Sequence, residues 1–168
     1  MRKPIKTLQD AISYQLRGLI GAEIKVAAEF KHCEDRIHSV KVRSALSQYV
    51  KTANDRLLKL NRVFSYLMQE PRMRQNEIID SMIEETHRLS ETSATPQLKD
   101  ILFVACIQNI NAYKVAGYKT AYLFAVEMEL DTPADLLLEI IQWETSAVAT
   151  LSELAISSFN ELNAHRTS

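Results

Sequence analysis

The residues of this chain that could do chemistry are charged side chains on otherwise apolar helical stripes. Glu23 falls on a stripe that advances by three or four residues and is otherwise formed by Leu8, Ile12, Leu16, Leu19, Val26 and Phe30. Lys114 and Glu144 interrupt two similar stripes further along the chain. A buried charge without a partner costs several kcal/mol, so each of these residues marks a binding site or has a partner of opposite charge.

Three further polar residues lie beside such stripes rather than on them. Lys51 and Asn54 flank the apolar stripe of the region 36–69 by one position, and Asn111 lies one turn before Lys114. We therefore expect two carboxylates and two ammonium groups on or beside the inner faces of four helices. The alternative for Lys51 is exposure, because a lysine at the edge of a stripe can extend its ammonium group into water.

Two E-x-x-H strings, Glu29/His32 and Glu84/His87, have the spacing of metal ligands on one face of a helix. Both strings stand among other charged residues, so we expect both pairs on the solvated surface. The sequence offers no recognisable set of serine, histidine and acid. We predict no catalytic residue and favour a protein that is not an enzyme.

The bulk composition limits the classes of function. The chain has 168 residues, of which 46% are hydrophobic and 24% charged, and this is typical of a globular protein with a single domain, here residues 1–168. Its net charge of −1 predicts no binding to nucleic acid or to an anionic membrane. Cys33 and Cys106 lack metal-type spacing, and we expect them to be reduced in the cytoplasm.

Prolines and breaks in periodicity divide the chain into helices. We predict four long helices over 6–33, 36–69, 96–130 and 133–163, and a shorter one over 72–91. Thr95-Pro96 and Thr132-Pro133 have the form of a capping residue followed by a first-turn proline. The short helix is long enough to carry the chain from one end of a bundle to the other. The pattern predicts an all-α bundle of two helical hairpins with this crossover helix between them.

Five stretches carry a resemblance to a known family, and they are TLQDAISYQLRGLIGAEIKVA, SALSQYVKTANDRLLKLNRVF, RMRQNEIIDSMIEE, DILFVACIQNINAYKVAGYKTA and LLLEIIQWETSAVATLSELAISSFN. Over nearly its whole length the chain resembles the ferritin-like stress-response proteins of the YciE/YciF type, which are small bacterial helical bundles. The resemblance implies a ferritin-like four-helix bundle with an additional crossover helix, a di-metal carboxylate centre and a homodimer.

Most of the metal ligands that the resemblance implies are replaced in this sequence. Glu23 matches the glutamate of the first helix, and Glu144 matches the glutamate of the last. The other ligand positions fall on Lys51, Asn54, Asn111 and Lys114. Two acidic positions have become lysine, which places positive charge where a metal ion would lie.

We therefore predict two ion pairs in place of the metal, Glu23 with Lys51 and Glu144 with Lys114. Asn54 and Asn111 would complete the hydrogen bonding of the two carboxylates. Changing Lys114 to methionine should then destabilise the protein by leaving Glu144 unpaired.

The sequence is compatible with three functions. The favoured one is a non-catalytic ferritin-like bundle with a degenerate di-metal site and a role in stress physiology. We expect such a protein to need no cofactor. The second is an oxidase- or peroxidase-type protein that holds iron or manganese through Glu23 and Glu144. The third is an interaction or small-ligand-binding module that uses the space vacated by the metals.

Overall fold

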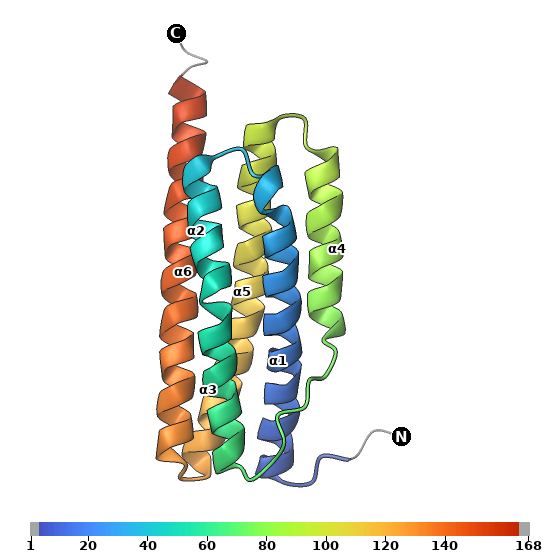
Figure 1. Ribbon diagram of the computed structural model, residues 1–168, viewed down its shortest axis with the longest axis vertical. Helices are drawn as coiled ribbons and strands as arrows, with labels where there is room; N and C mark the ends of the chain where they lie inside the picture. Colours follow the sequence, from blue (N-terminus) through green and yellow to red (C-terminus); the bar gives the residue numbers. More distant parts are fainter. Residues whose placement is uncertain (1–3, 165–168) are drawn as a thin grey trace.

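The computed structural model describes residues 4–164, and these are built from helices and connecting segments. In chain order the elements are α1 (Leu8–Cys33), the 3-10 turn η1 (Glu34–Arg36), α2 (Val40–Lys51), α3 (Ala53–Tyr66), α4 (Glu77–Thr92), α5 (Pro96–Glu127) and α6 (Asp131–Ala164) (Figure 1). The prediction of an all-α protein is confirmed. No helix in the described part of the chain has the length and apolar character needed to cross a bilayer.

Four rods lie side by side along the long axis of the molecule, and they are α1, the α2–α3 pair, α5 and α6 (Figure 1). α1 and the α2–α3 rod form one hairpin, and α5 and α6 form the other. α4 packs on the outside of α1 and α5, and the irregular segment before it and α4 together carry the chain from one end of the bundle to the other. This arrangement lets each of the four rods contribute side chains to one central region.

Local capping explains where the helices begin. The Thr95 hydroxyl accepts a hydrogen bond from the Leu98 N–H, with Pro96 in the first turn, as predicted. The corresponding prediction for Thr132-Pro133 is wrong, because α6 already begins at Asp131. Pro133 lies in the first turn of that helix, where its missing N–H costs no hydrogen bond.

The predicted helices 36–69 and 72–91 differ most from the structure. The first is replaced by a 3-10 turn and by α2 and α3, which are separated at Thr52. The second begins only at Glu77, after the Asn76 side chain accepts a hydrogen bond from the Ile79 N–H. Residues 70–76 run along α1 instead of joining the helix, and the Arg74 N–H donates to the Arg17 carbonyl at 3.0 Å.

The core consists of two apolar clusters. The first cluster includes Leu16, Leu60, Tyr118 and Leu137, and the second includes Val26, Leu46, Ile107 and Leu151. Along each rod, one charged and fully buried residue stands near the point where the first cluster gives way to the second, and these residues are Glu23, Arg56, Lys114 and Glu144. A charged layer thus divides the apolar core near its middle.

Candidate functional site: a buried ion network

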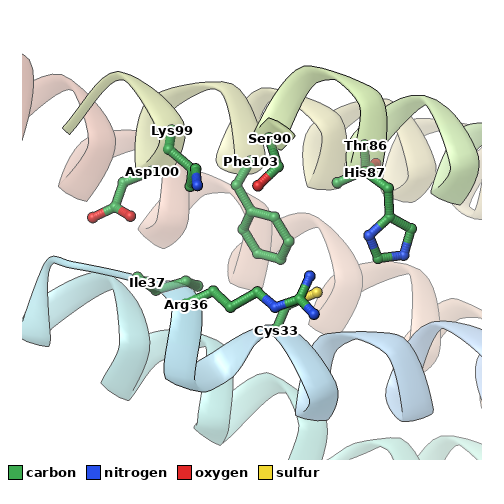
Figure 2. A pocket seen from close by; sticks show the side chains of 9 residues that line it. All are labelled: Cys33, Arg36, Ile37, Thr86, His87, Ser90, Lys99, Asp100 and Phe103. Atoms are coloured by element: carbon green, nitrogen blue, oxygen red, sulfur yellow. The ribbon is translucent and has the colours of Figure 1, made fainter. Parts of the chain in front are cut away.

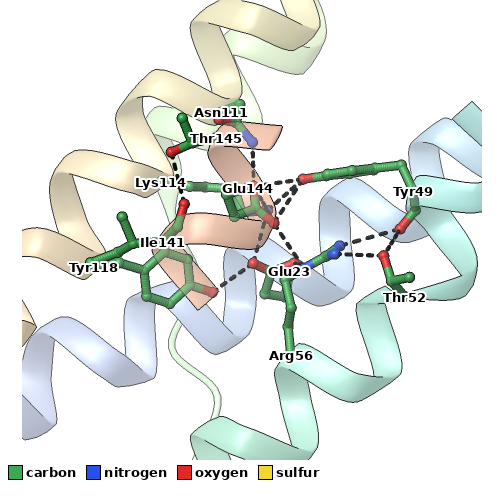
Figure 3. A network of polar contacts seen from close by, with 10 residues as sticks. All are labelled: Glu23, Tyr49, Thr52, Arg56, Asn111, Lys114, Tyr118, Ile141, Glu144 and Thr145. Carbon is green, nitrogen blue, oxygen red and sulfur yellow. Dashed lines mark hydrogen bonds and ion pairs between the residues drawn. The ribbon is translucent and has the colours of Figure 1, made fainter. Parts of the chain in front are cut away.

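Glu23 of α1, Arg56 of α3, Lys114 of α5 and Glu144 of α6 meet in the centre of the bundle (Figure 3). Arg56 is 2% exposed, and the other three side chains are fully buried. We call these four residues the ion network. Two carboxylates and two cations balance in formal charge, which is the condition under which charged groups can be buried without a large penalty.

Each cation of the ion network contacts both carboxylates. The Arg56 Nε lies 2.9 Å from a Glu23 oxygen and 2.8 Å from a Glu144 oxygen. The Lys114 Nζ lies 2.8 Å from the other Glu23 oxygen and 3.1 Å from a Glu144 oxygen. The four groups therefore form a closed ring of contacts rather than two separate pairs.

Neutral side chains saturate the remaining oxygen atoms. The Tyr118 hydroxyl donates to Glu23 at 2.6 Å, and the Tyr49 hydroxyl donates to Glu144 at 2.9 Å. The Lys114 ammonium donates in turn to the Tyr49 hydroxyl at 2.8 Å. The Asn111 amide also donates to Glu144. Such hydrogen bonds reduce the free-energy cost of burying the charges.

The break between α2 and α3 helps to position Arg56. At the break, the Thr52 hydroxyl donates to the Tyr49 carbonyl at 2.9 Å and accepts from Arg56 Nη1, also at 2.9 Å. The Arg56 Nη2 donates to the same Tyr49 carbonyl at 3.4 Å, and the guanidinium lies 4.5 Å from the centre of the Tyr49 ring. The guanidinium is therefore held at its far end by the Thr52 hydroxyl and the Tyr49 carbonyl, and at its Nε by the carboxylates (Figure 3).

The protonation properties of the ion network follow from burial and from the opposing charges. Burial acts to raise the pKa of Glu23, but the charges of Lys114 and Arg56 outweigh it and place that pKa below its ordinary value. Burial raises the pKa of Glu144, and the negative charge of Glu23 adds to this effect despite the opposing pull of Lys114. Burial acts to lower the pKa of Lys114, but the two carboxylates together raise it.

The structure brings four of the six predicted site residues together. Lys114 contacts Glu144, as the predicted pair requires, and it also contacts Glu23. Asn111 donates to Glu144 in the expected role.

The predicted pair of Glu23 with Lys51 is wrong, and so is the role given to Asn54. Both Lys51 and Asn54 are exposed, and Arg56 takes the place expected for Lys51. The physical reason is that the α2–α3 rod buries a different face from the one that the prediction assumed. Of these three residues, only Arg56 lies on the face that points to the centre of the bundle.

Three members of the site were missed by sequence reasoning, namely Arg56, Tyr49 and Tyr118. Tyrosines at helical spacing indicate packing in the first place, and Arg56 is not on the stripe that lies beside Lys51 and Asn54. A signal for Arg56 and Tyr49 was present in the series at alternating steps of three and four formed by Leu46, Tyr49, Ala53, Arg56, Leu60, Val63 and Leu67. All seven of these residues are buried. Val50 and Leu57, which belong to the alternative stripe beside Lys51 and Asn54, are only partly buried.

The E-x-x-H strings do not act as units. Glu29 of α1 and His87 of α4 contact each other across the two helices, with 3.2 Å between carboxylate oxygen and ring nitrogen. His32 and Glu84 are exposed. The expectation of two solvated pairs is therefore wrong for Glu29 and His87, which are both partly buried.

A small cavity lies between η1 and the helices α4 and α5 (Figure 2). Its volume is about 10 Å³, which is room for about one water molecule. Cys33 lines this cavity, and burial raises the pKa of its thiol. Cys33 and Cys106 are both free thiols, which agrees with the expectation of reduced cysteines, and both are buried.

The ion network does not fit the di-metal centre that the family resemblance implies. Within residues 4–164, no group of three or more His, Cys, Asp or Glu side chains is arranged to hold a metal ion. Glu23 and Glu144 are the two carboxylates of the site, and the same two cations contact both of them. A divalent ion would have to displace or accommodate these positive charges.

Comparison with known proteins gives the family. Residues 7–164 match a family described as a domain of unknown function, DUF892. The chain belongs to the DUF892 family. The protein YciF of Escherichia coli K12 is 20% identical to this DUF892 chain over 158 residues, which cover 94% of this chain and 95% of YciF.

Two solved structures are also similar to this DUF892 protein. The E. coli stress protein YciF superimposes with a TM-score of 0.88 at 20% identity, over 93% of this chain and 99% of YciF. YcfI from Rhodopseudomonas palustris superimposes with a TM-score of 0.85 at 22% identity, over 90% of this chain and 96% of YcfI. The predicted relation to proteins of the YciE/YciF type is confirmed.

Proposed function

We propose that this DUF892 protein is a non-catalytic, ferritin-like bundle of one domain, in which the ion network stands in place of a di-metal centre. The observation that carries the proposal is that Arg56 and Lys114 each contact both Glu23 and Glu144. One long crossover connection between two hairpins, which here contains α4, is found in ferritin-like folds and supports the ferritin-like assignment.

The electrostatics of the site oppose a bound divalent ion. A dication about 5 Å from one of the two cations would be repelled by roughly 7 kcal/mol at an effective dielectric constant of 20. The two carboxylates would also lose their present partners on binding the ion. The network thus supplies by itself the positive charge that a metal would supply in a di-metal protein.

The biological role that we propose is structural, in stress physiology, and as a homodimer. The stress assignment draws on the E. coli relative, which is named a stress protein. The network would contribute to this role by fixing how the four rods align. A charge displaced by one helical turn along any rod would be buried without its partners.

Metal content tests the proposal. The protein is purified without chelator, incubated with ferrous or manganous ions, desalted and analysed by plasma mass spectrometry beside the Glu23→Gln and Glu144→Gln variants. We expect far less than one ion per chain in all three proteins. About one or two ions per chain in the wild type, lost in both variants, would overturn the proposal and favour a metal-dependent oxidase-type protein.

A further inference from the structure

A groove runs over the break between α2 and α3, on the side that faces α6. Its volume is 330 Å³, within the range of sites that bind small molecules. Arg56 of the ion network lines the inner part of the groove. Tyr49, whose hydroxyl donates to Glu144 of the network, lies beside it. The apolar lining consists of Ala45 of α2 and of Trp143 and Ala147 of α6. The other polar lining residues are Gln48, Thr52, Asp55, Ser146 and Thr150.

The walls of the groove suit an apolar or aromatic body. Trp143 is 41% exposed, which is unusual for the largest apolar side chain, and the two alanines leave space beside it. The Trp143 ring already attracts a cation, because the Lys59 ammonium lies 4.8 Å from its centre. An aromatic wall of this kind favours a positively charged ligand over a negatively charged one.

The available charge in the groove is negative. Arg56 lines the groove, but its guanidinium is committed to Glu23, Glu144, Thr52 and the Tyr49 carbonyl. Asp55 is exposed, and none of the ion pairs among the described residues includes it. A ligand that lies in the groove can therefore complement Asp55 with a positive group.

We infer that this groove binds a small organic cation, in which an aromatic or alkyl body lies between Trp143 and the two alanines and an ammonium group faces Asp55. The inference goes beyond the proposed function, because it concerns a surface groove and not the buried charges. The reasons are the concave shape, the aromatic and small apolar lining, and the uncommitted carboxylate.

Trp143 is the single tryptophan of the chain, so its fluorescence reports directly on the groove. Three probes share one body and differ in charge, namely 4-phenylbutylamine, 4-phenylbutan-1-ol and 5-phenylpentanoate. We expect a saturable change of Trp143 emission with the amine, which should bind about three- to fivefold more tightly than the alcohol because its charge faces an exposed carboxylate. The carboxylate probe should bind most weakly.

Matched variants assign the binding to the groove. Asp55→Asn should make the amine and the alcohol bind equally, while Glu84→Gln, which removes an exposed carboxylate on α4, should leave the preference unchanged. Ala147→Leu fills the groove from α6 and should weaken all probes by about tenfold or more. Ala45→Leu repeats this test from α2 in case the first variant does not fold, and circular dichroism verifies the fold of each.

Four results would overturn the inference. One is the absence of a saturable change with the wild-type protein. Another is binding that persists unchanged in the folded Ala147→Leu or Ala45→Leu variant. Equal binding of the amine and the alcohol by the wild type would overturn the assignment to cations.

The fourth result concerns a second copy of the chain as the occupant. In that case the wild-type protein would sediment as a dimer and would not bind the probes. The Ala147→Leu variant would sediment as a monomer. None of these outcomes depends on metal content, so the groove and the proposed function fail or stand separately.

Discussion

The ion network and the two apolar clusters beside it stabilise the bundle under different conditions. A residue of an apolar cluster such as Leu60 is stabilised by any apolar neighbour. Its contribution to the stability of the fold therefore depends mainly on how well the space around it is filled. Arg56 stabilises the fold only when the carboxylates of Glu23 and Glu144 are within contact distance. The clusters therefore supply stability, and we expect the network to supply alignment of the rods. The difference teaches that, among equally buried residues, a charged one tolerates a single substitution less well, because it depends on particular partners.

The largest effect is expected from Arg56→Met. It leaves Glu23 and Glu144 to share a single cation, which should lower the free energy of unfolding by about 3–5 kcal/mol. Leu60→Ala in the first cluster provides the comparison, with an expected loss of about 2–5 kcal/mol from the lost contacts and the cavity. Urea unfolding followed by circular dichroism measures both.

A fourfold apolar replacement shows whether the Arg56→Met loss comes from unpaired charge. Replacing Glu23 and Glu144 by leucine, and Arg56 and Lys114 by methionine, removes every charge of the network at once. This protein should recover the loss, because well-packed apolar groups are often as stable as a buried ion pair or about 1–4 kcal/mol more stable. If it is less stable than Arg56→Met, the network contributes stability and not only alignment.

A smaller effect is expected from Tyr118→Phe. The substitution removes the hydroxyl that donates to Glu23 but keeps the ring in the first cluster, so the loss should be about 1.5–3 kcal/mol. Tyr122→Phe is the control, since that ring packs against the same cluster from a partly buried position, and it should change stability by less than about 0.5 kcal/mol. Equal effects of the two substitutions would argue against a role for the Tyr118 hydroxyl.

The pH dependence of stability distinguishes the carboxylate of Glu23 from that of Glu144. The pKa of Glu23 lies below its ordinary value of 4.5, so its contribution is fully present above about pH 4.5 and is lost as the pH falls through the lowered pKa. The pKa of Glu144 is raised above 4.5, so folding favours its protonated form. Its contribution to stability is therefore present below about pH 4.5 and is lost as the pH rises through the raised pKa. Thermal melting between pH 3 and pH 7 should therefore show a shallower acid decline for Glu23→Gln than for Glu144→Gln. Parallel declines in the two variants would contradict the assignment.

The smallest effect is expected at the surface, from Lys51→Met. Because Lys51 is exposed, removing its charge should change the free energy of unfolding by no more than about 0.5 kcal/mol. A loss as large as that of Arg56→Met would mean that Lys51, and not Arg56, pairs with Glu23. The same urea unfolding experiment decides between the two.

The sequence alone determined the all-helical architecture and three of the four residues of the ion network, and of its ion pairs it identified the one between Lys114 and Glu144. Apolar spacing and the Thr95-Pro96 pair identify the long helices, since these signals are local in the chain. Lys114 and Glu144 could be recognised as a pair because each is the charged member of an otherwise apolar stripe. Their burial follows from neighbours within two helical turns, so no tertiary information is required.

The tertiary structure decided which face of the α2–α3 rod is buried. Two overlapping stripes compete in that region, one beside Lys51 and the other containing Arg56, and both are amphipathic enough to face a core. The choice depends on the break at Thr52 and on the carboxylates of α1 and α6, which lie far away in the sequence. Tyr49 and Tyr118 acquired their roles in the same way, because a hydroxyl donates only to the acceptor that the other helices bring to it.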